Sequence, residues 1–230
     1  MFTIVFWLGC AGSQKIIPQT PPTTGATILE TIDLSTEFGP EFNGWYYHLT
    51  LQESLQGTDI VLPAESGWAA IGTEDRTLLG TGFFPLSSPS EICASGCRLL
   101  AVHTSQSNSN QKIPIQADHS LTKQVAPKDS VGITMLDTWT QPLTTLPIST
   151  KNLRLRAVTL APNGNVGQHK HEGRPSFAYI LSGDVIEHRG DGDGEHSRGH
   201  RVAERSGLVH WWENGESDST IVVFDIIDAD

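Results

Sequence analysis

The chain has 230 residues and a formal net charge of −11, from 26 acidic and 15 basic side chains. This excess of negative charge argues against binding to nucleic acid or to an anionic membrane through a broad basic face. A chain of this length can bury a sizeable core, as one large domain or two small ones. Many glycines and prolines, short apolar runs and the lack of a sustained helical repeat together predict an all-β fold.

Residues 1–27 have the composition of an export signal followed by a tether. The apolar run at residues 1–11 is too short to span a bilayer as a helix, and it resembles the end of a bacterial lipoprotein signal, in which a Leu-Gly pair precedes the lipidated cysteine, here Cys10. The positively charged start of such a signal is missing, so a buried strand is the alternative. Residues 19–25 are rich in Pro and Thr, as in an extended tether. The segment therefore predicts an extracytoplasmic protein anchored by a lipid at Cys10, with a cytoplasmic location as the alternative.

Residues 28–150 form a β-rich region without a recognisable catalytic motif. Short alternating runs, such as residues 45–51, are typical of half-buried strands. This region has weak sequence similarity to the C-terminal part of the chain. Either a duplication that lost its metal ligands or chance similarity would explain it. Cys93 and Cys97 predict a small disulfide loop if the protein is exported, and free thiols if it stays in the cytosol.

The candidate site lies between residues 163 and 214. His169 and His171 project from the same face of a strand-like segment, because side chains alternate along a strand. His210 can join them if the chain folds back as antiparallel strands, and residues 189–195, dense in Gly and Asp, predict the hairpin loop that this requires. Three converging imidazoles predict one divalent metal ion but do not identify it, because imidazole suits zinc, copper, iron and nickel alike. The remaining histidines of this stretch are assigned to a solvated turn: His188, His196 and His200.

This spacing resembles the two sequence motifs of the cupin superfamily. The second motif, G-x5-P-x-G-x2-H-x3-N, has Arg205 in place of its proline and is otherwise matched in register by Gly199, Gly207, His210 and Asn214. The first motif, G-x5-H-x-H-x(3,4)-E-x6-G, is matched by His169, His171 and Gly183, with Asn163 in place of the leading Gly and Ser176 in place of the Glu.

The resemblance implies a barrel of the cupin, double-stranded β-helix or jelly-roll kind, with the metal-binding domain at residues 151–230. Residues 28–150 would then be either additional strands or the degenerate half of a bicupin, and such barrels often form homodimers. The three motif histidines are implied as the ligands of one divalent metal ion, which could be Fe, Mn, Ni or Zn. Because Ser176 replaces the usual carboxylate, a Ser176→Glu change is expected to tighten metal binding, provided that the side chain points inward. Glu172 is the nearest natural substitute, although it would face the other way on a continuing strand.

Two functions are compatible with the resemblance. The first is a metal-dependent enzyme, of the oxygenase or isomerase type, that acts on a small organic molecule. The second is a non-enzymatic module that binds a small ligand, tethered outside the cytoplasm. Open coordination positions beside three histidines favour the enzyme, whereas the missing glutamate and the lack of a recognisable general base favour the module. The residues expected to contact the small molecule are Arg174, Ser176, Tyr179 and Trp212.

Overall fold

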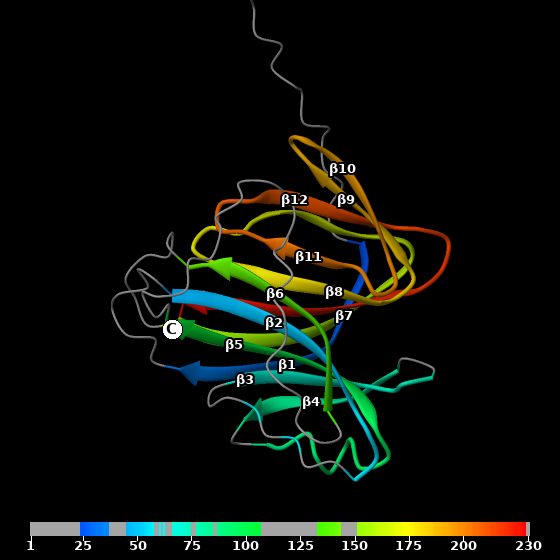
Figure 1. Cartoon of the computed structure of the whole chain (residues 1–230). Coiled ribbons are helices and arrows are strands. Elements are labelled where there is room, and N and C mark those ends of the chain that lie inside the picture. The colour runs from blue at the N-terminus through cyan, green and yellow to red at the C-terminus, as the bar shows by residue number, and fades with distance from the viewer. Residues whose placement is uncertain are drawn as a thin grey trace, which may run out of the picture.

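The computed structural model describes residues 24–36, 45–57, 60, 62, 66–74, 77–84, 87–106, 133–143 and 151–228. Within these ranges the chain is built from strands β1 to β13, and the strands pair only in antiparallel fashion (Figure 1). The all-β fold expected from the sequence is confirmed. In the same ranges there is no helix with the length and apolar character that crossing a bilayer requires. The candidate lipidation site, Cys10, lies outside the described residues.

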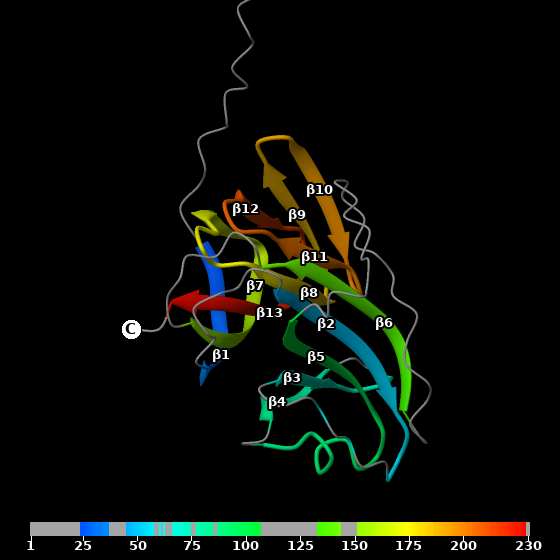
Figure 2. The same ribbon diagram turned by 60° about the vertical axis from the view of Figure 1, so that its left-hand side comes forward.

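Two antiparallel sheets make up the fold. The five-stranded sheet has the order β4-β3-β5-β2-β6 and is formed by β2 (Trp45–Ser54), β3 (Ser66–Ile71), β4 (Leu78–Phe84), β5 (Cys97–Gln106) and β6 (Ile133–Pro142). The eight-stranded sheet has the order β10-β9-β12-β7-β13-β8-β11 and is formed by β1 (Thr24–Thr36), which pairs with β7, and by β7 (Lys151–Lys170), β8 (Ser176–Ser182), β9 (Asp184–Arg189), β10 (Gly192–Ser197), β11 (Arg201–Glu204), β12 (Val209–Asn214) and β13 (Ser219–Asp228). The second sheet curls into a barrel, and its β9–β10 hairpin projects at the end of the molecule away from β3 and β4 (Figure 2).

Strand alternation divides the buried side chains of the eight-stranded sheet between two cores. On β8, Phe177 and Tyr179 belong to the core that this sheet shares with the five-stranded sheet. The next residues along the strand, Ala178 and Ile180, belong to the core inside the barrel, together with Trp212 of β12. Even-numbered positions of β8 therefore face the barrel interior, which places Ser176 there as well.

β1 joins the C-terminal sheet although it lies at the start of the described chain. Its residues pair with β7 from Thr36 opposite Lys151 to Thr24 opposite Asn165. The shared core likewise combines residues from both parts of the chain, for example Leu49 and Leu153. The two parts of the chain on either side of residue 150 therefore share a core, and the expected segment boundaries at residues 27 and 150 stay predictions. The proposed descent of residues 28–150 from a cupin half stays a prediction.

The hairpin expected at residues 189–195 forms, but its turn is much shorter than expected. Arg189 pairs directly with Gly192, so only Gly190 and Asp191 connect β9 to β10. The remaining residues, taken from the sequence as a solvated loop, form β10 instead. Glycines at alternate positions weaken strand propensity locally, which hid this strand, yet pairing with β9 overrides that preference.

Two motif positions are explained by their backbone conformation. Asn163 has a φ of 57°, in the left-handed region that glycine populates freely and that asparagine tolerates better than most residues. Asparagine can therefore occupy this position of β7, where the first motif has its leading glycine. Gly183 has a φ of 76°, and a Cβ there would lie 2.7 Å from the carbonyl oxygen of Asp218. This position therefore requires glycine.

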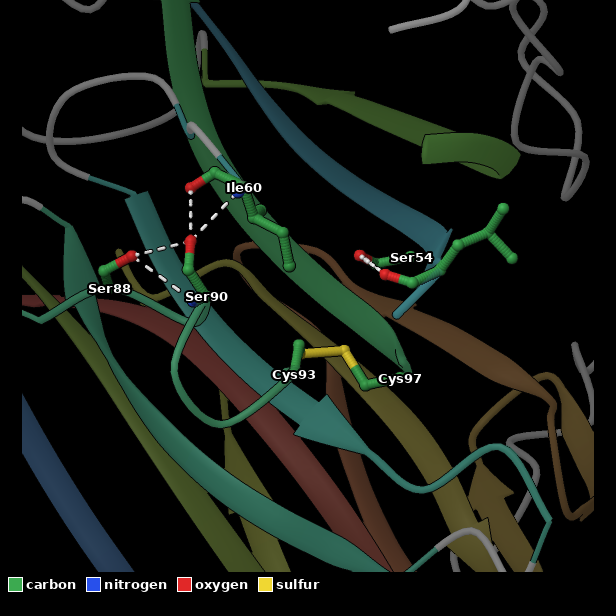
Figure 3. Close-up of a disulfide and its surroundings, with 7 residues drawn as sticks. Ser54, Ile60, Ser88, Ser90, Cys93 and Cys97 are labelled. Atoms are coloured by element: carbon green, nitrogen blue, oxygen red, sulfur yellow. Dashed lines mark hydrogen bonds between the residues drawn. A yellow bond between two sulfur atoms is a disulfide. The ribbon is translucent and has the colours of Figure 1, made fainter. Parts of the chain in front are cut away.

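A disulfide joins Cys93 and Cys97 on the outer side of the five-stranded sheet (Figure 3). Both residues are fully buried, in a cluster with Trp68 and Leu99. The loop that precedes the bridge is held by Ser90, whose hydroxyl oxygen lies 2.9 Å from the backbone nitrogen of Ile60. Of the two states that the sequence left open for these cysteines, the structure has the bridged one.

Candidate metal centre

Three histidines from two paired strands converge inside the barrel. His169 and His171 lie at the end of β7 and just beyond it, and His210 on β12 pairs with His169 across the ladder. The Nε2 atom of His210 lies 2.9 Å from Nε2 of His171 and 3.0 Å from Nε2 of His169. The convergence predicted from the H-x-H pair and the distant third histidine is therefore present, and His171 and His210 are each only 1% exposed.

The opposite nitrogen of each ring faces a fixed hydrogen-bond acceptor. Nδ1 of His169 lies 3.0 Å from the carbonyl oxygen of Gly167, and Nδ1 of His171 lies 3.0 Å from that of Arg174. Nδ1 of His210 lies 2.5 Å from a carboxylate oxygen of Glu187. Each Nδ1 therefore carries the proton and donates it, so each Nε2 of a neutral ring presents a lone pair to the centre.

Nε2 of His210 is at hydrogen-bonding distance from the Nε2 atoms of the other two rings, but none of the three carries a proton to donate. Buried acceptors that face one another without a donor are unfavourable, and a cation at their meeting point removes that cost. Ligand atoms that are each about 2.1 Å from one ion lie about 3.0 Å apart when they subtend a right angle, which is close to the two Nε2–Nε2 distances. The donor set and its tautomers thus fit a divalent metal.

Burial favours the neutral form of His169 and His171. It lowers the pKa of His169 to about 4, even though the hydrogen bond to Gly167 acts in the opposite direction. Burial also lowers the pKa of His171, against the opposing influence of Glu204. Neutral imidazole is the form that binds metal, so the site is ready for an ion at neutral pH.

We expect the metal-free protein to lose stability as the pH falls from 6.5 towards 4. The folded-state pKa of His169 is depressed to about 4, so the unfolded chain takes up this proton at higher pH than the folded chain. The stabilisation is complete above pH 6.5 and is lost as the pH approaches 4, by on the order of 2 kcal/mol. Thermal unfolding with a chelator present should show this decline, and His169→Gln should flatten it. A wild-type protein with pH-independent stability in this window would refute the expectation.

Glu187, on β9, orients the third histidine and was missed from the sequence. Its carboxylate also accepts hydrogen bonds from Nε2 of His196 at 3.1 Å and from Arg189 at 2.7 Å. Burial alone would raise the pKa of Glu187, but the hydrogen bonds from His196, His210 and Arg189 outweigh it and hold the pKa well below its usual range. A carboxylate of this kind behind a ligating histidine fixes the ring and increases its basicity. His196, assigned from the sequence to a solvated turn, belongs to this network.

A second buried carboxylate, Glu204 on β11, lies on the Nε2 side of the histidines. It is 3% exposed, and its two oxygens lie 3.5 Å from Nε2 of His210 and 3.7 Å from Nε2 of His171. The hydroxyl of Ser176 donates a hydrogen bond to it. One signal could have revealed both carboxylates, since Glu187 and Glu204 each follow a buried valine by two residues and so share its inward face.

Of the other residues expected at the site, Trp212 and Ser176 lie near the histidines and Tyr179 does not. Trp212 lies inside the barrel with its ring 5.7 Å from that of His210, whereas its neighbour Trp211 stacks on His188 on the other face of β12, as strand alternation requires. Ser176 also lies beside the histidines, with its hydroxyl 3.3 Å from Nδ1 of His171. Tyr179 is buried in the core between the sheets, on the opposite face of β8, and so the structure does not bring it to the site.

Arg174 and Glu172 contribute in other ways than the sequence suggested. The backbone carbonyl of Arg174 holds His171, and its guanidinium lies near the carbonyl oxygen of Lys170 on the exposed side. Glu172 has a side chain that is 77% exposed and pairs with Lys170 at 2.8 Å. As its position in the sequence indicated, Glu172 faces away from the histidines.

A cavity of about 570 Å³ opens between the β9–β10 hairpin and β11. Glu187 and Val202 line its inner part, and Arg201 and Arg205 line its rim. This volume lies within the range of sites for small organic molecules. Since Glu187 is hydrogen bonded to His210, the cavity reaches the network that holds the histidines.

No protein-family model and no curated protein matches the chain. Among solved structures, it is similar to a predicted oxalate decarboxylase from Thermotoga maritima, at 32% identity and a TM-score of 0.31, over 32% of this chain and 64% of that one. It is also similar to a sugar phosphate isomerase from a cupin superfamily from Silicibacter pomeroyi, at 18% identity and a TM-score of 0.30, over 32% of this chain and 49% of that one. A third likeness is to a cupin domain from Bordetella pertussis, at 17% identity and a TM-score of 0.29, over 32% of this chain and 80% of that one.

The matched part of the chain spans less than two thirds of the length of the first two of these structures. The strand order of the eight-stranded sheet and the convergence of the three motif histidines are features of this chain itself. They confirm the barrel and the converging histidines expected from the sequence, and membership of the cupin superfamily stays a prediction.

Proposed function

We propose that this protein is a metal-dependent cupin enzyme of the oxygenase or isomerase type, which binds one divalent ion and acts on a small organic molecule. The observation that carries the proposal is the convergence of three Nε2 atoms whose rings are each held through Nδ1. Three ligands on one side leave coordination positions open, as catalytic sites do and closed structural sites do not. When bound, the ion would supply Lewis-acid polarisation of a coordinated oxygen or, if redox-active, an electron pathway to it.

The chain contributes orientation, electrostatics and a binding space. Glu187 fixes His210 and is itself fixed by His196 and Arg189, so the ligand geometry does not depend on flexible surface groups. Trp212 shields the histidines from the side of the barrel core. Arg201 and Arg205 line the cavity and suit the recognition of a carboxylate or phosphate, because a guanidinium fork pairs with such groups in a bidentate manner. We therefore infer a small anionic substrate.

Metal analysis followed by turnover assays tests this proposal. Protein purified without a histidine tag should contain close to one equivalent of a divalent metal. Oxygen uptake with small chelating acids, strictly dependent on bound iron or manganese, would identify an oxygenase, and metal-dependent conversion without oxygen uptake would identify an isomerase. Stoichiometric ligand binding without turnover would instead select the non-enzymatic module. Protein that binds no metal under any of these conditions would end the proposal.

We also propose that the protein works outside the cytoplasm, attached by a lipid at Cys10. The sequence before the first described strand supports this, and so does the bridge between Cys93 and Cys97, since such bonds persist mainly in oxidising compartments. We expect Cys10→Ser to move the protein from the membrane fraction to the soluble fraction, by more than tenfold on quantitative blotting. Alkylation of the untreated protein should find no free thiol at Cys93 or Cys97. A wild-type protein that fractionates with the cytoplasm, or that has both thiols free, would contradict this location.

A further inference from the structure

We propose that Glu204 is the carboxylate ligand of the metal centre, transposed from β8 to the neighbouring strand β11. This inference rests on the proposed metal-dependent function and completes its ligand set. The first cupin motif would carry a glutamate at position 176, where this chain has serine. The structure assigns the missing carboxylate to β11, at the last variable position between Gly199 and Arg205 of the second motif.

The register of the sheet makes this exchange possible. Glu204 on β11 is directly opposite Ser176 on β8 in the antiparallel ladder. Side chains of directly opposed residues leave the sheet on the same face, with Cβ atoms about 5 Å apart. A carboxylate can therefore reach nearly the same point from either strand, provided that the partner position holds a small residue.

The distances fit shared coordination. The two oxygens of Glu204 lie 3.5 and 3.7 Å from the Nε2 atoms of His210 and His171, respectively. Those contacts are too long for hydrogen bonds. Two ligand atoms that are each about 2.1 Å from one ion and subtend about 120° lie about 3.6 Å apart. The oxygens of Glu204 therefore lie at the distance from these Nε2 atoms that is expected of a second ligand on the same ion, and they are not hydrogen bonded to the rings.

Ser176 has become the support for this carboxylate. Its hydroxyl donates a hydrogen bond to Glu204 and so satisfies one oxygen of a side chain that is 3% exposed. On its other side, Ser176 is opposite Asp225 of β13, which is fully buried. A glutamate at position 176 would add a third carboxylate between these two. Ser176→Glu alone should therefore weaken the site, contrary to the expectation from the motif.

The other carboxylates near the histidines are committed elsewhere. Glu172 points into solvent and pairs with Lys170. Glu187 accepts hydrogen bonds on the Nδ1 side of His210, which is the side away from the converging Nε2 atoms. Within the part of the chain that the structure describes, Glu204 is the buried carboxylate that faces the Nε2 atoms.

The first test is Glu204→Gln, which keeps the size of the side chain and removes its charge. Dissociation constants for Zn²⁺ and Mn²⁺, measured by competition with a chelator, should rise by about a hundredfold relative to wild type. The visible absorption of the Co²⁺-loaded protein should change in position and intensity, because the coordination shell loses an oxygen ligand. The matched control is Glu172→Gln, an exposed glutamate next to His171, which should bind with wild-type affinity and spectrum. Wild-type affinity and spectrum in Glu204→Gln would overturn the proposal.

The second test moves the carboxylate back to β8. Glu204→Ser should bind as weakly as Glu204→Gln, and the exchange variant Ser176→Glu/Glu204→Ser should recover at least tenfold in affinity. Ser176→Ala keeps the carboxylate and removes only its support, so it should lose no more than a few-fold. Circular dichroism checks that each variant is folded, and if the exchange variant is not, Glu204→Gln decides the question.

The outcomes separate this inference from the function on which it rests. If wild type binds no metal, the proposed function fails and Glu204 has no ion to bind. If wild type binds one equivalent and both Glu204 variants match it, the proposed function stands and the assignment of Glu204 is wrong. A folded exchange variant that stays as weak as Glu204→Ser would likewise overturn the transposition.

Discussion

His210→Ala should abolish stoichiometric metal binding while leaving the protein folded. The change removes the Nε2 atom that lies 2.9 and 3.0 Å from its two counterparts, so only the pair on the β7 segment remains. Two imidazoles and water retain a divalent ion far more weakly than three, and we expect a loss of about a thousandfold or more in affinity. The barrel core is formed by apolar side chains such as Ile180 and Val223, and so the fold should persist. Metal analysis after dialysis and a thermal melt measure the two properties.

His188→Ala is the matched control. His188 lies on β9, with its ring stacked on Trp211 and paired with Asp193 and Glu213 on the outer side of the sheet. It should retain a full equivalent of metal. If His210→Ala also keeps a full equivalent, the three-histidine centre is wrong.

Asp225→Ala should cost about 3–5 kcal/mol in the free energy of unfolding, the largest stability effect that we expect from one substitution in this barrel. Asp225 is fully buried and pairs in a bidentate manner with Arg154, at 3.0 and 2.5 Å, and with Arg156 at 3.2 Å. Burial lowers the pKa of Arg156 while Asp225 acts to raise it, so the carboxylate is what makes the charged form of this side chain acceptable. Without it, two half-buried guanidinium groups face each other.

Urea denaturation of the two proteins gives the difference directly, and Asp193→Ala serves as the comparison. The side chain of Asp193 is 64% exposed and contacts only His188 among the ion-pair partners described. Its removal should change stability by less than about 1 kcal/mol. If the two variants lost the same free energy of unfolding, the buried ion-pair cluster would contribute no more to stability than the exposed pair.

The sequence predicted those features that follow from local periodicity. The H-x-H pair on a strand follows from alternation and the return of the third histidine follows from the hairpin, and both are present. Asn163 could replace a glycine in the motif because it tolerates the same left-handed backbone. These features need no knowledge of which strands are neighbours.

The features that the sequence did not reveal depend on strand register. Glu204 faces the histidines only because β11 pairs with β8 so that it stands opposite Ser176. Glu187 reaches His210 because β9 pairs with β12. Tyr179 was placed at the site although it is one residue out of phase with Ala178, which faces the barrel interior. A sequence motif gives the spacing of the ligands along the chain. The residues that orient those ligands lie on neighbouring strands of the sheet, and the motif does not identify them.

The position of β1 has a consequence for how the molecule is assembled. β1 is the first described strand to be synthesised, yet its partner is β7, which begins only at Lys151. Contacts so distant in sequence form slowly, because a long loop must close before any of them is gained. Until then β1 is an open strand edge, available for pairing with other chains. We therefore expect the barrel to be completed late in folding, after β7 has been synthesised, so that the first described strand is among the last to be placed.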